Sequence, residues 1–389
     1  MTNLNDDGPG SFRDAVSKPR RTVVFDVGGI IRIKSRLQVA SDITIAGQTA
    51  PGDGITVYGE RVAFSDNAIV RYIRFHGSID MPRGGCTLII DNLKNAIFDH
   101  VSVAWGRWDN LHIKGTSDVT LQHCIFAEGI DPQMFGALIE RPDNITIHHC
   151  LWSNNQSRNP KGKARLQYFN NVVYNWRVSG FVGGHSAADH FQDLINNYFI
   201  AGPNSNNNFV AGFTATDHVY HSGNFVDLDK DGVLNGRLVT DGDFVKTAPA
   251  PGSRTASGES MKAANPTLVP KPSNTSPAPV KIEDAAAAYE KVLAGAGASL
   301  RRDSVDARQV AHVRSLGREG AIILRESDVG GQPEVKGGPA PKDSDGDGIP
   351  DAWELANGLD PNDPADARKT VASGYTHLEN FVNGLVPRG

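Results

Sequence analysis

Basic side chains are concentrated in one short stretch of this sequence. Arg158, Lys161, Lys163 and Arg165 lie within a few positions of one another. A row of cations suits an extended polymer with regularly spaced carboxylates, such as a polyuronate. Elimination from a uronate removes the proton at C5, so the site needs a base as well as cations that neutralise the neighbouring carboxylate. The stretch therefore indicates an acidic polysaccharide as partner, although a solvated surface turn could have the same composition.

A second group of chemically active residues lies near the C-terminal end. Asp343, Asp345, Asp347, Asp351 and Glu354 occupy loop positions 1, 3, 5, 9 and 12, with a glycine at position 6. An EF-hand-type loop has this spacing, because a hard cation takes oxygen ligands and the glycine allows a sharp turn. The sequence therefore predicts a structural calcium site.

Two further acidic segments extend this prediction. The carboxylates of 360–366 could complete the same site. The segment 227–235 copies the first half of such a loop but has Leu238 at the twelfth position, which leaves its metal binding open.

The first two-thirds of the chain repeats one short phrase, made of a polar residue, an alternating strand and a turn. Clear copies begin at Asp42, Asn67, Asn95, Asp118 and Asn144, and weaker copies follow. The starts are roughly 21 to 28 residues apart, which is one coil of a parallel β-helix plus variable loops. We therefore predict an all-β fold, a right-handed single-stranded parallel β-helix over residues 1–240.

Alternation within the phrases predicts which side chains point into the coil. Two inward columns are expected: Val101, Cys124 and Cys150, and Val103, Phe126 and Trp152. The two cysteines are then buried thiols, with a Cys124–Cys150 bridge as the less favoured alternative. Asparagines at the bends are expected to hydrogen-bond from coil to coil, at Asn170, Asn171, Asn196, Asn197 and Asn224.

Three histidines, His100, His123 and His149, occupy matching positions in successive phrases. The alignment raises a metal site as one interpretation. Their spacing lacks the close i, i+4 pattern of a closed metal site, so a stacked ladder on the coil surface is favoured.

The remaining segments differ in composition. Residues 241–281 are rich in Pro, Ala and Ser, as in a linker or wrapping loop, and 282–330 hold two short amphipathic helices, over 282–293 and 305–313, that should dock on the β-helix. Residues 331–384 form the predicted calcium-binding module, and 385–389 resemble an expression scar.

Charge and hydropathy narrow the possible partners and location. A net charge of −5 without a strong Lys/Arg run argues against nucleic acid. No apolar stretch approaches the roughly 20 residues of a membrane span. We expect a monomer without nucleic-acid or membrane partners.

Several ordered motifs resemble the bacterial pectate lyase family, polysaccharide lyase family 1, over residues 1 to about 330. They lie at 2–13, 24–29, 45–55, 70–75, 98–100 and 157–160. The resemblance implies β-elimination from pectate or pectin, secretion or a periplasmic location, Arg158 as base, and Lys161 or Lys163 as its assistant. The C-terminal module is similar to dockerin-like or thrombospondin-type-3 calcium repeats.

The sequence departs from that family where a catalytic calcium ion would bind. Cys86 stands near an expected aspartate, and beyond Asp109, the one retained metal ligand, stand Asn110 and His112. A hard cation gains little from thiol or imidazole. Calcium in the cleft therefore remains open.

Nearby side chains offer substitutes for that ion. Arg83 and Arg107 could take over its charge, as arginine does in calcium-independent pectin lyases. Trp108 and Trp105 are candidate sugar-stacking surfaces, although core packing is as good an interpretation for one of them.

Two other functions compete with the lyase. A glycoside hydrolase needs two carboxylates across the scissile bond, and Glu128, Asp131, Glu140 and Asp143 are available on neighbouring loops, without forming a hydrolase-like cluster. A noncatalytic carbohydrate-binding or adhesin β-helix is the other alternative. The sequence leaves open the uronate, its methylation, and endo or exo action.

Overall fold

The computed structural model describes residues 1–141, 143–245, 265–274 and 280–387. Its strands form three sheets, called A, B and C here, and consecutive strands step from one sheet to the next. Sheet A holds β1 (Arg21–Val23), β4 (Ile43–Ala46), β7 (Ala68–Arg71), β10 (Lys94–Asp99), β13 (Ser117–Gln122), β16 (Asp143–His148), β19 (Arg165–Phe169), β22 (His190–Ile195), β25 (Asp217–Ser222) and β28 (Thr267–Leu268). Sheet B holds β2 (Gly29–Arg32), β5 (Ile55–Gly59), β8 (Arg74–Gly77), β11 (Ser102–Ala104), β14 (Ile125–Ala127), β17 (Leu151–Ser153), β20 (Val172–Tyr174), β23 (Tyr198–Ile200), β26 (Phe225–Asp227) and β27 (Arg237–Leu238). Sheet C holds β3 (Leu37–Gln38), β6 (Val62–Ala63), β9 (Leu88–Asp91), β12 (Asp109–Lys114), β15 (Phe135–Glu140), β18 (Lys161–Lys163), β21 (Phe181–Val182) and β24 (Val210–Ala211).

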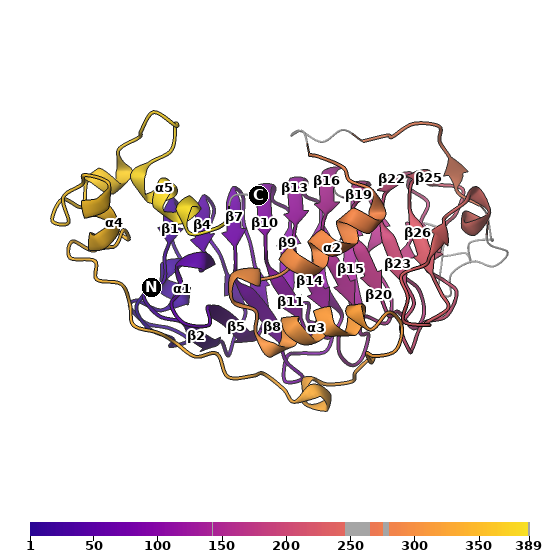
Figure 1. The fold of residues 1–389 in the computed structure, drawn as a ribbon, viewed down its shortest axis with the longest axis horizontal. Coiled ribbons are helices and arrows are strands. Elements are labelled where there is room, and N and C mark those ends of the chain that lie inside the picture. Colours follow the sequence, from indigo (N-terminus) through magenta and orange to yellow (C-terminus); the bar gives the residue numbers. More distant parts are fainter. Residues whose placement is uncertain (142, 246–264, 275–279, 388–389) are drawn as a thin grey trace.

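Strands from successive coils pair in parallel along each sheet. The exception among the named pairs is β26 with β27, which is antiparallel. Each coil therefore adds one strand to each sheet, and the strands stand side by side along the long axis of the molecule (Figure 1). The predicted parallel β-helix is confirmed.

The core is formed by the inward columns expected from alternation. Val103, Phe126 and Trp152 share one register, and the Phe126 and Trp152 rings stack 4.4 Å apart. Cys124 and Cys150 are buried and free, so the alternative of a bridge between them is wrong.

An asparagine ladder closes the bend between sheets A and B in the later coils. Asn171 donates from Nδ2 to Asn197 Oδ1 over 3.0 Å, and Asn197 donates to Asn224 Oδ1 over 2.9 Å. The residue that precedes each asparagine at this bend has a left-handed backbone, which Asn and His tolerate better than most residues. The predicted coil-to-coil asparagine bonds are confirmed.

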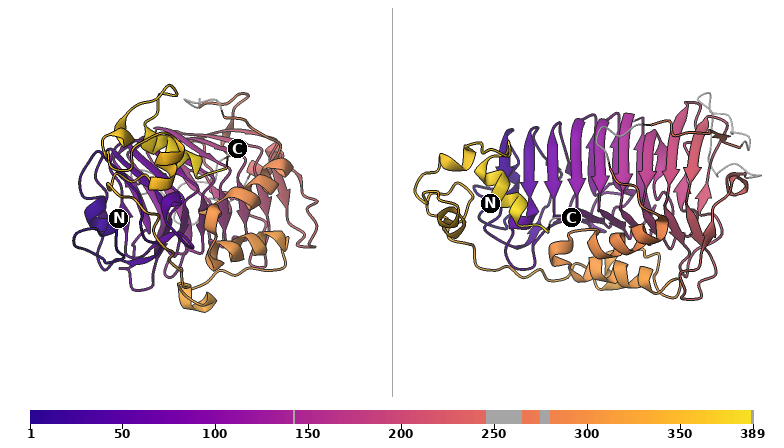
Figure 2. Two further views of the ribbon diagram at one scale, coloured as in Figure 1. Left: turned by 60° about the vertical axis from the view of Figure 1, so that its left-hand side comes forward. Right: turned by 45° about the horizontal axis from the view of Figure 1, so that its top comes forward.

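Two helices that run roughly antiparallel to each other cover part of sheet B (Figures 1 and 2). They are α2 (Ala285–Gly295) and α3 (Ser304–Arg314), joined by the 3₁₀ turn η3 (Ser299–Arg301). Their apolar sides join Leu151, Val172 and Tyr174 in one buried cluster. Short helices of this length depend on such packing for stability.

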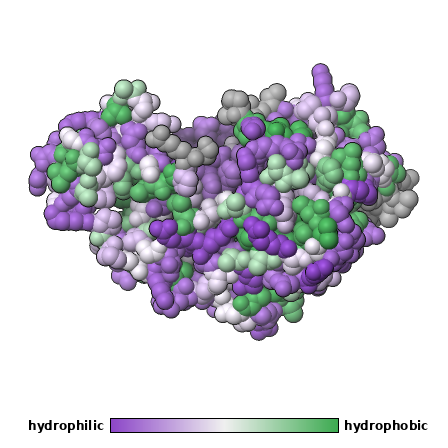
Figure 3. Space-filling view, viewed as in Figure 1, coloured by the Kyte–Doolittle hydropathy of each residue, from purple (hydrophilic) through white to green (hydrophobic). Residues whose placement is uncertain are grey.

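On the face of the molecule drawn in Figure 3, hydrophilic side chains prevail, with separate hydrophobic areas between them.

The segment after the β-helix is not simply a linker. Within residues 241–281 the structure describes η2 (Asp241–Phe244) and strand β28, which continues sheet A beside β25. Asn274 donates to Asp193 Oδ2 over 3.0 Å, so this part of the chain is fastened to the coil. Residues 246–264 and 275–279 lie outside the described residues.

The C-terminal module packs against the first coil, near the N-terminus (Figure 1). It contains α4 (Asp351–Ala356), η5 (Asp366–Arg368) and α5 (His377–Gly384), and the chain reaches it through η4 (Glu326–Val329). Ile349, Phe381 and Val382 pack there with Ala46 and Val24. At the same end, α1 (Phe12–Ala15) and η1 (Gly47–Thr49) complete the helical elements of the described chain. Residues 388–389 of the predicted scar lie outside the described part.

No helix in the described ranges is both long and apolar enough to cross a membrane.

Candidate active site

The basic stretch forms strand β18 of sheet C and the loop before it. Lys161 and Lys163 are two positions apart, so both side chains lie on the outer face. Gly162 between them faces the core, where an added Cβ would lie 3.0 Å from the Phe181 ring. Register pairs Lys163 with Glu140 of β15, and Lys161 with Leu138.

Arg158 lies in the loop before β18 and is held by a carboxylate from two coils away. Its Nη1 donates to Oδ2 of Asp109 over 3.0 Å and to Oδ1 over 3.2 Å. Its guanidinium carbon also lies 4.1 Å from the centre of the Phe135 ring. Asp109 is fully buried, and burial raises its pKa to about 6 against the opposing effect of Arg158. Both contacts favour a charged, fixed guanidinium.

Lys161 is the most perturbed cation of this cluster. Burial, followed by the nearby charges of Arg158 and Lys163, lowers its pKa to about 7. Its Nζ lies 2.8 Å from Nε2 of His185, whose Nδ1 lies 3.1 Å from the carbonyl oxygen of Gly212. That carbonyl can only accept, so His185 carries its proton on Nδ1 and accepts from Lys161 at Nε2. Burial and Lys161 lower the pKa of His185 to about 4, which keeps the ring neutral.

Lys163 has a carboxylate neighbour on the same face. Its Nζ lies 3.7 Å from Oε2 of Glu140, and Oε1 of the same carboxylate lies 4.0 Å from Nζ of Lys114. The Glu140 carboxylate is therefore shared between Lys163 and Lys114, whereas Lys161 has no carboxylate within ion-pair distance in the described chain.

Arg83 and Arg107 meet at Asp131. Arg107 is mostly buried and donates to the carbonyl oxygens of Asp131 and Met81 over 2.9 and 2.7 Å. Arg83 is 71% exposed and lies 3.3 Å from the Asp131 carboxylate. Arg83 is thus exposed to solvent even though it pairs with Asp131, whereas Arg107 mainly holds the loop.

Trp108 and Trp105 differ in burial. Trp108 is 39% exposed, which suits a stacking surface. Trp105 is fully buried and donates from Nε1 to Oε2 of Glu128 over 3.1 Å, so core packing is its role.

Arg165 does not belong to the cluster of Arg158, Lys161 and Lys163. It lies on β19 of sheet A, where its guanidinium carbon is 4.1 Å from the centre of the Phe191 ring and its Nε is 3.8 Å from Asp143. Sheet A is a different face of the coil, so proximity in sequence did not place it in the site.

The four carboxylates considered for a hydrolase are each paired with a cation. Glu128 is bound by Arg308, Asp131 by Arg83 and Arg107, Glu140 by Lys163, and Asp143 lies near Arg165. A hydrolase needs two carboxylates that are free to act on either side of the scissile bond, which such pairing opposes.

The C-terminal loop brings oxygens together. Two groups of possible metal ligands meet there, Asp343 with Asp345 and Asp347, and Asp347 with Glu354 and Asp366. Glu354 is fully buried, and neither of its carboxylate oxygens has a hydrogen-bond partner. One oxygen each of Asp345, Asp347 and Asp366 is also buried without a partner. Burial and the surrounding carboxylates raise the pKa of Glu354 to about 7.

The structure gives position 9 of this loop a different role. Asp351 accepts from the backbone N–H of Ser344 over 2.7 Å and pairs with Lys342 over 2.6 Å, so its carboxylate is turned away from the group. Asp366, from the second acidic segment, occupies the group in its place. The half-loop at 227–235 is not among the possible metal groups of the described chain.

Sequence reasoning missed two participants, Phe135 and His185. They reach their partners through register and loop folding, and neither stands in a motif. His185 in particular lies in a loop more than 20 residues from Lys161 along the chain. Asp366 belongs to the second acidic segment, which was expected as a possible completion of the calcium site.

The fold and this outer-face cluster define a β-helical protein with a cationic site on sheet C. No family model matches the chain. Probable pectate lyase C of Aspergillus flavus is 43% identical over 399 residues, which covers 100% of this chain and 89% of that protein. Probable pectate lyase C of Emericella nidulans is 41% identical over 400 residues, with 100% and 88% covered. The chain therefore belongs to the pectate lyase family, and it is a polysaccharide lyase.

These relatives also refine the expected resemblance. They are fungal, whereas the motifs had indicated bacterial members. The match extends over the whole chain, including the C-terminal module, and gives no support for a dockerin-like or thrombospondin-type-3 identity there.

The solved structures that match this chain are more distant in sequence. The thermostable pectate lyase PL 47 is 15% identical with a TM-score of 0.47, covering 69% of this chain and 70% of that one. Jun a 1, the major allergen from cedar pollen, is 15% identical with a TM-score of 0.47, covering 76% and 87%. At this distance they say nothing about individual residues.

Proposed function

We propose that this lyase cleaves a uronate polymer of the pectate type by β-elimination at the outer face of sheet C. The observation that carries the proposal is the cluster of Arg158, Lys161 and Lys163, in which Lys161 has a pKa lowered to about 7. The curated relatives are named pectate lyases, which supports the same substrate class.

The reaction needs two different actions at one sugar. A fixed cation must neutralise the uronate carboxylate, so that the C5 proton becomes acidic, and a neutral base must remove that proton. The C4–oxygen bond then breaks as the double bond forms between C4 and C5. The leaving oxygen must take up a proton from solvent or a nearby acid.

Arg158 and Lys161 are the two candidates for the base. Family resemblance favours Arg158, but Asp109 and Phe135 stabilise its guanidinium in the charged form. Lys161 has a pKa of about 7, and a base works best when its pKa is near the operating pH. We therefore assign proton removal to Lys161, and carboxylate binding to Arg158 and Lys163.

A catalytic calcium ion does not fit the residues around Asp109. The Asp109 carboxylate is paired with Arg158, and Asp109 is in none of the possible metal groups of the described ranges. Cys86 nearby has a pKa raised to about 12 by burial, so it is a neutral thiol that a hard cation does not favour. We propose that exposed Arg83 supplies positive charge toward the substrate and that Trp108 stacks on a sugar ring.

Calcium is proposed instead for the C-terminal module, with a structural role. Asp343, Asp345, Asp347, Glu354 and Asp366 would hold it, since their carboxylates lie together and all of them except Asp343 have a buried oxygen without a hydrogen-bond partner. The module packs on the first coil, so the ion would stabilise that end of the β-helix.

One assay tests the reaction class. Polygalacturonate, methylated pectin, alginate and glucuronan are offered separately, and both ultraviolet absorbance of the unsaturated product and reducing ends are followed. The proposal expects both to rise on polygalacturonate or pectin. A rise in reducing ends without absorbance would mean hydrolysis and would overturn it.

We also propose that the enzyme acts outside the cell, because its polymeric substrate cannot enter the cell. We propose further that it acts as a monomer. Size-exclusion chromatography with light scattering tests the monomer, and assay of culture medium against cell extract tests the location.

A further inference from the structure

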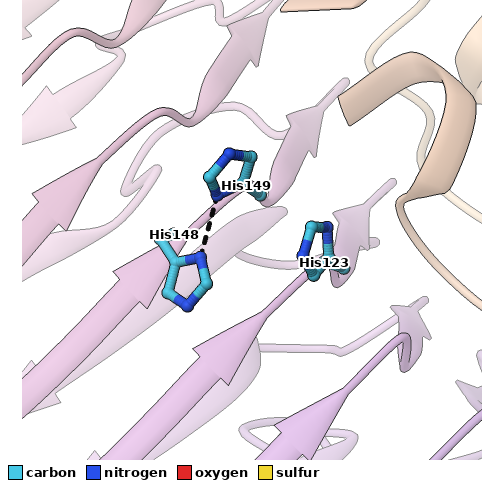
Figure 4. Close-up of side chains that lie close together, drawn as sticks. All are labelled: His123, His148 and His149. Carbon is cyan, nitrogen blue, oxygen red and sulfur yellow. Dashed lines mark hydrogen bonds between the residues drawn. The ribbon is translucent and has the colours of Figure 1, made fainter. Parts of the chain in front are cut away.

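A cluster of three histidines, of which His148 and His149 are buried and His123 is half-buried, lies at the bend between sheets A and B, on a different part of the coil from the cationic site. His148 ends β16 and His149 follows it, while His123 follows β13 in the preceding coil (Figure 4). One ring nitrogen of each lies within 4.8 Å of one nitrogen of the other two. We propose that these side chains bind a borderline divalent transition metal such as Zn²⁺.

A surface ladder does not account for this cluster. His100, His123 and His149 do stack in sequence, with ring centres 4.7 and 5.0 Å apart. His148 is outside that ladder, yet its Nδ1 lies 2.8 Å from Nδ1 of His149 (Figure 4). The stacked column would be complete without it.

Two nitrogens of the cluster are buried without a hydrogen-bond partner. They are Nδ1 of His123 and Nε2 of His148, and the His148 side chain is only 4% exposed. Buried polar atoms are nearly always paired, so unpartnered ones call for a ligand or water. A metal ion bound between the three rings would take Nδ1 of His148 and Nδ1 of His149 as ligands in place of the contact between them, since these two atoms face one another (Figure 4).

Glu283 orients one of the proposed ligands. Its Oε2 accepts from Nε2 of His149 over 2.8 Å, which leaves the Nδ1 lone pair of His149 directed at His148. A carboxylate that holds the far nitrogen of a histidine is a common support for metal ligation. Lys291 pairs with Glu283, so the positive charge nearest the cluster is already compensated.

The donor type selects the metal class. The group that could hold a metal in the described ranges consists of three imidazoles without a carboxylate, which suits Zn²⁺ and its neighbours rather than calcium. Burial first, and mutual repulsion second, lower the pKa values of His123 to about 4 and His148 to about 3, so both are neutral at ordinary pH. Zinc–nitrogen bonds of about 2.0–2.1 Å would separate tetrahedral ligands by about 3.4 Å. This lies between the 2.8 Å that separates the Nδ1 atoms of His148 and His149 and the 4.8 Å within which all three ligand atoms lie.

Such an ion would join two coils to the segment that leads into α2. Its ligands come from the ends of β13 and β16, and Glu283 precedes α2 by two residues. The role expected is therefore structural, separate from the elimination reaction.

The test uses the full chain without a polyhistidine tag, stripped with chelator and titrated with Zn²⁺, and with Co²⁺ as a spectroscopic probe. The Asp347→Asn background removes competition from the C-terminal loop. We expect one Zn²⁺ per chain, visible Co²⁺ bands of a nitrogen-rich site, and a Tm that rises with Zn²⁺. His123→Gln should lose all three, whereas the matched control His100→Gln should retain them.

A milder variant protects the test against misfolding. Glu283→Gln leaves the three ligands in place and should weaken Zn²⁺ binding by about 10- to 100-fold. Absence of stoichiometric binding to the parent protein, or binding unchanged in both His123→Gln and Glu283→Gln, would overturn the proposal.

Discussion

Replacing Lys161 by arginine tests the assignment of the base most directly. Arginine keeps the positive charge and much of the length, but its guanidinium does not lose a proton near neutral pH. With a pKa of about 7, about half of the Lys161 side chains are neutral at pH 7. A lysine with an ordinary pKa of 10.5 would be neutral in only about 3 of 10,000 molecules at that pH.

The pH profile of kcat/KM follows from this difference. Since the protonated amine cannot accept a proton, activity should rise about tenfold per pH unit below pH 7 and level off above it. Lys161→Arg should lower kcat by about 10²- to 10⁴-fold, the usual contribution of a general base, with the fold intact by circular dichroism.

Arg158 provides the matched comparison. Arg158→Gln removes a charge that depresses the pKa of Lys161, so the rise in activity should move to higher pH while KM increases. If Lys161→Arg instead keeps near-normal turnover and Arg158→Gln abolishes it at every pH, the base is Arg158 and our reasoning about Lys161 is refuted.

Three further outcomes are expected elsewhere in the molecule. Phe126→Ala should lower the free energy of unfolding by about 3–5 kcal/mol, because the ring is buried and stacked on Trp152, and urea denaturation would show a smaller loss if the column were loosely packed. Glu354→Gln should weaken calcium binding and remove the rise of Tm that calcium causes, while turnover stays close to that of the parent; an unchanged calcium response would exclude the proposed cage. Burial and Asp303 raise the pKa of Asp306, so the folded state keeps a proton that the unfolded chain has lost, and this group's contribution to stability falls as pH rises from about 4 to about 7. Asp306→Asn should flatten that part of the stability–pH curve in urea titrations, and an unaltered slope would show that the group does not titrate there.

The fold could be predicted from local patterns because a β-helix repeats the same pattern of strands and turns in every coil. Alternation of two along each strand assigned Val103, Phe126 and Trp152 to one inward column, and the structure stacks them. The bend asparagines were equally visible, since each needs only its neighbour one coil away.

The arrangement of the site could be predicted less well from the sequence. Sequence spacing placed Lys161 and Lys163 on one face but also grouped Arg165 with them, although a bend carries it to sheet A. Asp109 was expected to ligate a metal, and the structure instead pairs it with Arg158, 49 residues along the chain.

The sequence by itself determined the parallel β-helix, its inward columns and the position of the basic stretch, because these depend on short periodic patterns that repeat in every coil. Tertiary structure alone decided that His185 meets Lys161, that Asp366 replaces Asp351, and that His148 approaches His149 and His123. These contacts arise from loops, bends and coil register, where no period constrains the chain and residues distant in sequence become neighbours.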